Sequence, residues 1–192
     1  LSVSSLLAFM LLVSSTSLVI ASAPQTIDIQ VLAVNDFHGA LETTNAYGGV
    51  EYLATYVKNL EATNPNTMFV SGGDLIGASP LLSGIFHDEP TIEAFNLMGL
   101  DFATVGNHEF DEGSEELRRM QEGGCHPIDG CQDGDPFYGA EFKFLASNVI
   151  RLQNGQTLFS AYKVRSFAGV KVAFIGVALQ GTPAIVTAAG TA

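Results

Sequence analysis

Hydrophobic residues recur along this chain with two different periods, and segments of the two kinds alternate. Between residues 27 and 34 every second position is apolar, which is the period of a β-strand with one buried face. Between residues 48 and 63 apolar residues return every third or fourth position, which predicts an amphipathic helix that Asn64 and Pro65 end. The chain therefore begins its folded part with a strand followed by a helix.

The alternation continues through the rest of the chain. Apolar runs at 67–71 and 102–105 predict strands, and the patterns at 89–99 and 112–123 predict helices. Strand-like segments follow at 142–149, 161–167 and 170–179. This order predicts an α/β fold in which helices cover a sheet made mostly of parallel strands.

The first 23 residues follow neither pattern. LSVSSLLAFMLLVSSTSLVIASA has no charged residue, and its longest apolar run is shorter than the ~20 residues needed to span a bilayer. Its small terminal residues suit cleavage of a secretory signal peptide after Ala21 or Ala23. A buried helix is the alternative, but SSTS interrupts the apolar run. We expect a leader at 1–23 that lacks its true N-terminus, and export of residues 24–192 to a periplasmic, cell-surface or extracellular location.

Composition and charge narrow the possible functions. Hydrophobic residues make up 47% of the chain and charged residues 15%, which excludes a disordered tail. The formal net charge is -12, and Lys58 is the only basic residue before Arg118. This balance argues against a nucleic-acid polymer or an anionic membrane surface as partner, and we expect no membrane span beyond the leader. A small anionic substrate would need metal cations between itself and the protein.

The two cysteines lie in a loop rich in Gly, Pro and Asp. Cys125 and Cys131 have five residues between them, which is not the C-x-x-C spacing of zinc or redox motifs. Export favours a disulfide between them, and two free thiols are the alternative. We interpret His126 in this loop, and His87 before a predicted helix, as surface residues and not as ligands.

Polar residues follow each of the first three predicted strands. NDFHG contains Asp36 and His38, SGGDLIG contains Asp74, and GNHEFD contains Asn107, His108 and Asp111. Because the carboxyl ends of parallel strands meet at one edge of a sheet, we expect these side chains to lie together. Unrelated solvated turns are the alternative, and three of them would not align in this way.

These residue types suit hydrolysis assisted by two metal ions. Asp and His bind Zn, Mn, Fe or Co, and one Asp can bridge two ions ~3.5–4 Å apart. Asn107 offers a neutral oxygen ligand. His108 and Asp111 have the character of a general acid and the carboxylate that orients it.

The segments VNDFHGAL, VSGGDLIGASPLLSG and TVGNHEFDEG resemble the N-terminal calcineurin-like metallophosphoesterase domain of the secreted 5'-nucleotidase family. That family includes nucleotidases, UDP-sugar hydrolases and 2',3'-cyclic-nucleotide phosphodiesterases. The resemblance runs from about Ile27 to the end of the chain, and it implies an αββα sandwich with a two-metal centre. It also implies roles for individual residues: Asp36 and His38 on the first metal, Asp74 bridging both, Asn107 on the second, and a catalytic His108 paired with Asp111.

The sequence departs from the family pattern in its second half. The family completes its metal centre with later histidines in Gly-His motifs, whereas this chain has no histidine after His126. We also expect this chain to lack the family's C-terminal nucleotide-binding domain. The resemblance therefore implies a partial sandwich, the N-terminal part of a longer phosphohydrolase of small nucleotides, which we expect to be inactive alone. The alternatives are a cyclic phosphodiesterase, a UDP-sugar hydrolase, a thiosulfohydrolase-like enzyme, or a non-catalytic secreted metal-binding module.

Overall fold

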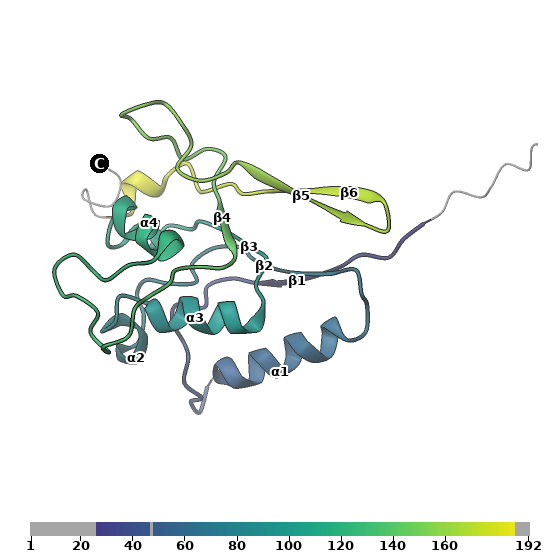
Figure 1. Ribbon diagram of the computed structural model, residues 1–192, viewed down its shortest axis with the longest axis horizontal. Coiled ribbons are helices and arrows are strands. Elements are labelled where there is room, and N and C mark those ends of the chain that lie inside the picture. Colours follow the sequence, from purple (N-terminus) through teal and green to yellow (C-terminus); the bar gives the residue numbers. More distant parts are fainter. Residues whose placement is uncertain (1–25, 47, 187–192) are drawn as a thin grey trace, which may run out of the picture.

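The computed structural model describes residues 26–46 and 48–186 (Figure 1). The predicted leader at 1–23 and its two cleavage positions lie outside the described residues. Within the described ranges, no helix combines the length and the apolar character needed to cross a bilayer.

Four short strands form a sheet that is parallel throughout. The strands lie in chain order, β1-β2-β3-β4, so each neighbour is reached by a crossover connection. This confirms the predicted α/β fold with a parallel sheet. β2 (Thr67–Ser71) has the predicted bounds. The other three strands are shorter than the apolar runs that predicted them: β1 (Gln30–Val34), β3 (Phe102–Thr104) and β4 (Lys143–Leu145).

The three predicted helices form, together with one short helix that was not predicted. Pro90 stands in the first turn of α3, and Gly99 ends that helix with a φ of 80°. In Figure 1, α1 and α3 lie side by side below the strands, in agreement with the contacts between them. The helices are α1 (Gly49–Glu61), α2 (Leu81–Gly84), α3 (Glu89–Met98) and α4 (Ser114–Glu122), and α2 is the unpredicted one.

Both faces of the central strands are buried, because alternate side chains point to opposite faces. Phe69 and Phe144 enter the larger core, where the Phe69 ring stacks on Phe95 of α3. Met68 and Leu145, their sequence neighbours, enter a second cluster on the other face. Burying one such side chain contributes about 1.5–3 kcal/mol. Two-sided burial explains why these strands are almost continuously apolar in the sequence.

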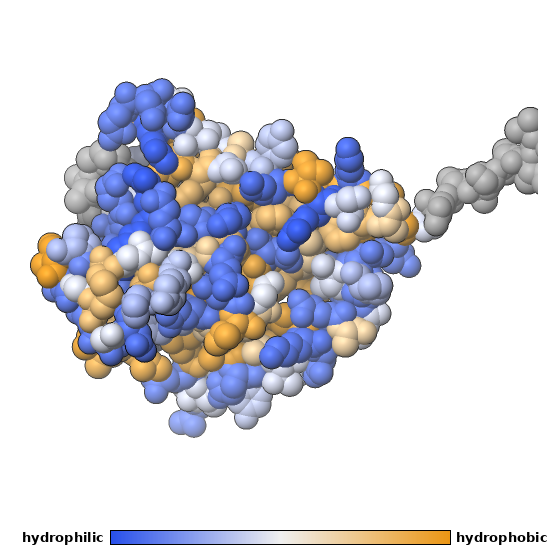
Figure 2. Space-filling view, in the orientation of Figure 1, coloured by the Kyte–Doolittle hydropathy of each residue, from blue (hydrophilic) through white to orange (hydrophobic). Residues whose placement is uncertain are grey.

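A separate antiparallel hairpin packs on the second face of the sheet. β5 (Tyr162–Phe167) and β6 (Val170–Ile175) pair with each other, and Phe167 contributes to the second cluster. Ala168 and Gly169 connect the strands with φ values of 44° and 89°, the positive values that a tight hairpin turn requires. Figure 2, drawn in the orientation of Figure 1, shows hydrophobic residues interspersed with hydrophilic ones on this face of the molecule.

Candidate active site

The loops after β1 and β2 run alongside each other beyond the carboxyl ends of their strands. The Asp36 and His38 amides donate to the carbonyls of Gly73 and Asp74, each at 3.1 Å. The parallel pairing of the two strands is thereby extended into the loops. This extension explains why two segments far apart in the sequence deliver their side chains to the same point.

Asp36, His38 and Asp74 come together at this point. Each offers one ligand atom, and these atoms lie within 4.8 Å of one another. The His38 Nδ1 lies 2.9 Å from the Gly77 carbonyl oxygen, which can only accept a hydrogen bond. The proton is therefore on Nδ1, and the lone pair is on Nε2, 4.0 Å from Asp36 Oδ1. Two carboxylates and an imidazole nitrogen form a donor set that fits a first-row divalent cation.

The backbone of all three residues is in the left-handed region, with φ values of 52°, 49° and 52°. Such conformations are uncommon for residues other than glycine and cost on the order of 1–3 kcal/mol each. They persist because the paired loops hold them. The candidate metal-ligating atoms of these three residues are therefore brought together by a backbone conformation that is uncommon in ordinary turns.

Glu109 connects the second and third loops. Its side chain is buried, and its carboxylate accepts the backbone N–H groups of Asp74 at 2.9 Å, Leu75 at 2.8 Å and Gly106. Burial raises the pKa of Glu109 to about 7, although the three N–H groups oppose that shift. Glu109 was not among the residues predicted from the sequence to form the site. A carboxylate between a strand end and the apolar Phe110 was the available signal.

His108 and Asp111 form the predicted pair. The His108 Nδ1 lies 2.8 Å from Asp111 Oδ2, and this hydrogen bond raises the pKa of His108 while partial burial opposes the rise. The His108 ring lies 4.8 Å from the His38 ring, measured between centroids. Gly77 packs against the pair so closely that an added Cβ would lie 2.7 Å from Asp111 Oδ2. The pair is therefore fixed beside the Asp–His cluster.

The third loop is held against Asp74 on both sides of Asn107. The His108 amide donates to Asp74 Oδ1 at 3.0 Å, and a Cβ on Gly106 would lie only 2.1 Å from the same oxygen. Asn107, which is partly buried, stands between these two contacts and precedes the short 3-10 helix η1 (His108–Phe110). Glycine is required at position 106 because the carboxylate occupies the space of a side chain.

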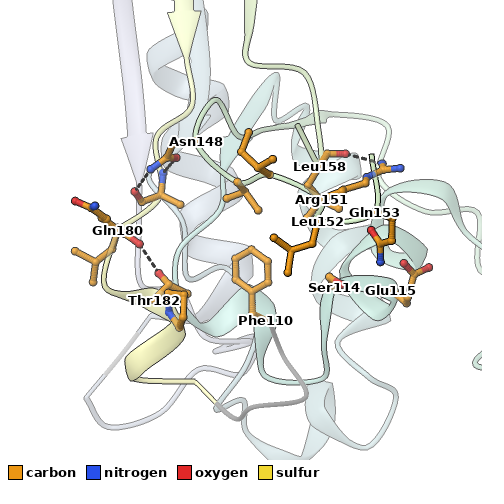
Figure 3. A pocket seen from close by; sticks show the side chains of 15 residues that line it. Phe110, Ser114, Glu115, Asn148, Arg151, Leu152, Gln153, Leu158, Gln180 and Thr182 are labelled. Carbon is orange, nitrogen blue, oxygen red and sulfur yellow. Dashed lines mark hydrogen bonds between the residues drawn. The ribbon is translucent and has the colours of Figure 1, made fainter. Parts of the chain in front are cut away.

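Two pockets of the described part of the chain differ in size and in the residues that line them, and the larger one is not the one that contains predicted site residues. A pocket of about 680 Å³ has a mostly apolar lining and contains none of the predicted site residues. Figure 3 shows Phe110 pointing into it beside Leu152 and Leu158. A smaller pocket of about 110 Å³ includes His108 and Asp111 in its lining. The hydrogen-bonded pair of His108 and Asp111 therefore faces the smaller of these two pockets, whereas Asp36, His38 and Asp74 line neither of them.

Cys125 and Cys131 form the predicted disulfide. The interpretation of His87 and His126 as surface residues is wrong. Their side chains are only 16% and 12% exposed, and their rings stack with a centroid separation of 3.8 Å. The loop closed by the disulfide folds back over the start of α3, and sequence periodicity gave no indication of that contact.

Metal-dependent hydrolases commonly set Asp and His ligands at the carboxyl edge of a parallel sheet, and this molecule has that arrangement. Residues 29–171 match the family of calcineurin-like phosphoesterases, and the chain belongs to that family. It is a member of a hydrolase family whose relatives include 5'-nucleotidases.

Three relatives illustrate the range of similar proteins. An uncharacterized protein encoded in the pqq-V 5' region of Acinetobacter calcoaceticus is 46% identical over 163 residues, which cover 74% of this chain and 80% of that protein. The cell wall protein Lmo0130 of Listeria monocytogenes is 37% identical over 87% of this chain and 24% of its own length. A 5'-nucleotidase of Vibrio vulnificus is 28% identical over 84% of this chain and 27% of its own length.

Solved structures agree with the fold. The calcineurin-like phosphoesterase YfkN of Bacillus subtilis superimposes with a TM-score of 0.61 and 25% identity, over 81% of this chain and 50% of that one. The NAD nucleotidase of Haemophilus influenzae superimposes with a TM-score of 0.63 and 22% identity, over 80% of this chain and 27% of that one. This chain thus spans about a quarter of several of its relatives.

Proposed function

We propose that this chain is part of the catalytic domain of an exported, metal-dependent phosphohydrolase that acts on nucleotide phosphomonoesters. One observation carries the proposal: the Asp36, His38 and Asp74 cluster lies directly beside the hydrogen-bonded pair of His108 and Asp111. A cation site and a positioned proton donor are the two components that phosphoester hydrolysis requires.

The cluster would hold two divalent ions of the Zn, Mn, Fe or Co type. Asp36 and His38 would bind the first, Asp74 would contact both, and Asn107 would bind the second. Ions bound there would lower the pKa of a water molecule and neutralise the charge on phosphate oxygens. Asp74 suits the position between the two ions. The His108 amide donates to one side of Asp74 Oδ1, and the second carboxylate oxygen of Asp74 is left to bind an ion.

His108 would protonate the leaving-group oxygen. Asp111 accepts a hydrogen bond from the His108 Nδ1–H, which leaves Nε2 as the nitrogen that exchanges a proton with the substrate. The raised pKa of His108 favours the protonated ring that a general acid requires. Asp111 therefore acts by orienting the ring and by stabilising its charge.

The nucleotide class of the substrate rests on the relatives and on charge. The Vibrio relative is named a 5'-nucleotidase, and the Haemophilus structure is of an NAD nucleotidase. The chain has a formal net charge of -12, so an anionic nucleotide needs cations at the site. Export is supported by the predicted leader, by the disulfide and by the cell wall relative.

The test is phosphate release from AMP by protein purified from its native host, with Mn²⁺, Co²⁺ or Zn²⁺ added and with EDTA as the control. We expect release that depends on the metal and that falls on substitution of His108. Bis(p-nitrophenyl) phosphate, a diester, serves as the comparison substrate. Activity unaffected by EDTA would contradict the metal-dependent mechanism, and hydrolysis of the diester without AMP hydrolysis would replace the nucleotidase assignment with a phosphodiesterase.

A further inference from the structure

Gly77 contacts both parts of the candidate active site. Its carbonyl oxygen lies 2.9 Å from His38 Nδ1 and accepts the ring N–H of that proposed metal ligand. On the other side, a Cβ at position 77 would lie 2.5 Å from the His108 carbonyl oxygen and 2.7 Å from Asp111 Oδ2. Because the hydrogen-bonded pair fills the space of a side chain, glycine is required at this position.

A glycine does not by itself fix the direction of its own carbonyl. Glycine adopts positive and negative φ values about equally readily, so its conformation depends on its surroundings. Gly77 has a φ of 79°, and Ala78 follows it in the left-handed region with a φ of 51°. A left-handed residue that carries a side chain persists only where surrounding contacts hold it. The carbonyl that orients His38 therefore needs an anchor nearby.

The side chain of Asp88 is such an anchor. Asp88 Oδ2 accepts the Gly77 N–H at 2.9 Å, and Asp88 is buried. Asp88 stands at the N-cap of α3, where an aspartate usually accepts a backbone N–H from the first turn of its own helix. It makes no such bond here, and its φ of 63° is left-handed. Its carboxylate therefore holds the loop after β2 and does not cap the helix.

The other oxygen of the Asp88 carboxylate is held by two buried hydroxyl groups. Ser83 Oγ of α2 donates to Asp88 Oδ1 at 2.6 Å. This bond uses the only hydrogen of the Ser83 hydroxyl, so Thr91 Oγ1 of α3 is the donor across the 2.6 Å contact between the two hydroxyls. Ser83 and Thr91 are both fully buried. A chain of hydrogen bonds thus runs from α3 through Asp88 and Gly77 to His38.

We propose that Asp88 is a positioning residue of the metal site, which acts through Gly77 to keep the His38 proton on Nδ1 and the lone pair on Nε2. The inference rests on the proposed function, in which His38 binds the first metal. Loss of a group that directly orients a ligand histidine typically lowers metal affinity ~10–100-fold. Asp88 acts one residue further from the ion, so we expect its removal to lower the affinity about tenfold, the lower end of that range.

The first test needs neither metal nor substrate. Nitrogen NMR of neutral histidine rings distinguishes the two tautomers, and His38→Gln assigns the His38 signals in the 192-residue chain. We expect the Nδ1–H form in the parent. Asp88→Gly tolerates the left-handed backbone but has no acceptor, so the signals should shift toward the average of the two tautomers. Asp88→Ser, whose oxygen is too close to its own backbone to reach the Gly77 N–H, should give the same shift and serves if the glycine variant does not fold.

Two further variants separate positioning from a general loosening of the fold. Asp88→Asn keeps an oxygen for the Gly77 N–H, and the Ser83 hydroxyl can reverse to accept from the new NH₂ group, so the tautomer of the parent should return. Thr91→Val is the matched control. It removes a hydrogen bond from the same buried chain but leaves the Asp88 acceptor in place, so it should lower the unfolding free energy without moving the His38 signals.

The second test measures Co²⁺ affinity in the complete enzyme. We expect about tenfold weaker binding in Asp88→Gly or Asp88→Ser, and parent-like binding in Asp88→Asn and Thr91→Val. Parent-like His38 signals in the folded glycine or serine variant would overturn the proposal, as would an equal shift in Thr91→Val. Because the tautomer is measured without metal or substrate, failure of the phosphohydrolase assignment would be seen separately, in the assay of phosphate release.

Discussion

The carboxylate of Glu109 accepts the backbone N–H of Asp74 at 2.9 Å, so a buried acid positions the proposed bridging ligand through its main chain. The same carboxylate also binds the amides of Leu75 and Gly106. Glu109 thus joins the loops after β2 and β3, together with the hydrogen bond from the His108 amide to Asp74.

Replacing Glu109 with Gln should destabilise the protein and weaken metal binding. One oxygen is exchanged for an NH₂ group that faces backbone donors, and an unsatisfied buried donor costs about 1–3 kcal/mol. Chemical denaturation measures the loss in unfolding free energy, with the exposed Glu141→Gln as control. Equal stability of the two variants would show that the carboxylate does not hold the loops.

Asp74→Asn should strongly reduce the divalent metal content of the candidate active site. The amide oxygen can still accept the His108 N–H, so the loop geometry is kept, but the anionic contact to the ions is lost. Metal analysis after dialysis measures the change, with Asp135→Asn matching the loss of charge. Full metal retention in Asp74→Asn would exclude a bridging role.

In the complete enzyme, His108→Ala should slow turnover by ~10²–10⁴-fold, the typical contribution of a general acid, and leave the metal content near normal. The reason is geometric: Asp74 is held by the main-chain N–H of residue 108, which alanine retains. Kinetics and metal analysis on one preparation separate the two effects. Loss of metal in this variant would make His108 a ligand and not a proton donor.

The disulfide should leave no thiol for alkylation in native, unreduced protein, as measured by mass spectrometry. Changing Cys125 and Cys131 to Ser together should lower the unfolding free energy by about 2 kcal/mol, because the bridge closes a short loop in the unfolded chain. Labelling of both thiols without reductant would contradict the first expectation. An unchanged unfolding free energy would contradict the second.

The sequence predicted those parts of the fold that follow from local periodicity. The strands, α1, α3 and α4 were visible because their buried positions recur at the periods of strand and helix. The four-residue α2 is too short to show a period. The strand predicted at 170–179 ends at Ile175 in the structure, since its apolar run continues past the end of pairing with Tyr162.

The candidate site was predicted where residue type and strand position coincide, and was missed where it depends on tertiary contact. Asp36, His38 and Asp74 follow strands of one sheet, so their meeting could be inferred from chain order. Glu109 acts through backbone amides of another loop, and its one signal in the sequence is a carboxylate placed between a strand end and the apolar Phe110. The pairing of His87 with His126 depends on how the disulfide loop folds back, and no periodic pattern encodes that.

The crossover topology of the sheet also bears on when the candidate metal site can form during folding. Gln30 pairs with Thr67, and Val70 pairs with Phe102, so each pairing must close a long connection before it gains stability. The loops that carry Asp36, Asp74 and His108 meet only after these closures. Metal ions would then bind a framework that is already folded, and chelation should abolish the activity of the complete enzyme without unfolding the chain, unlike in a zinc finger.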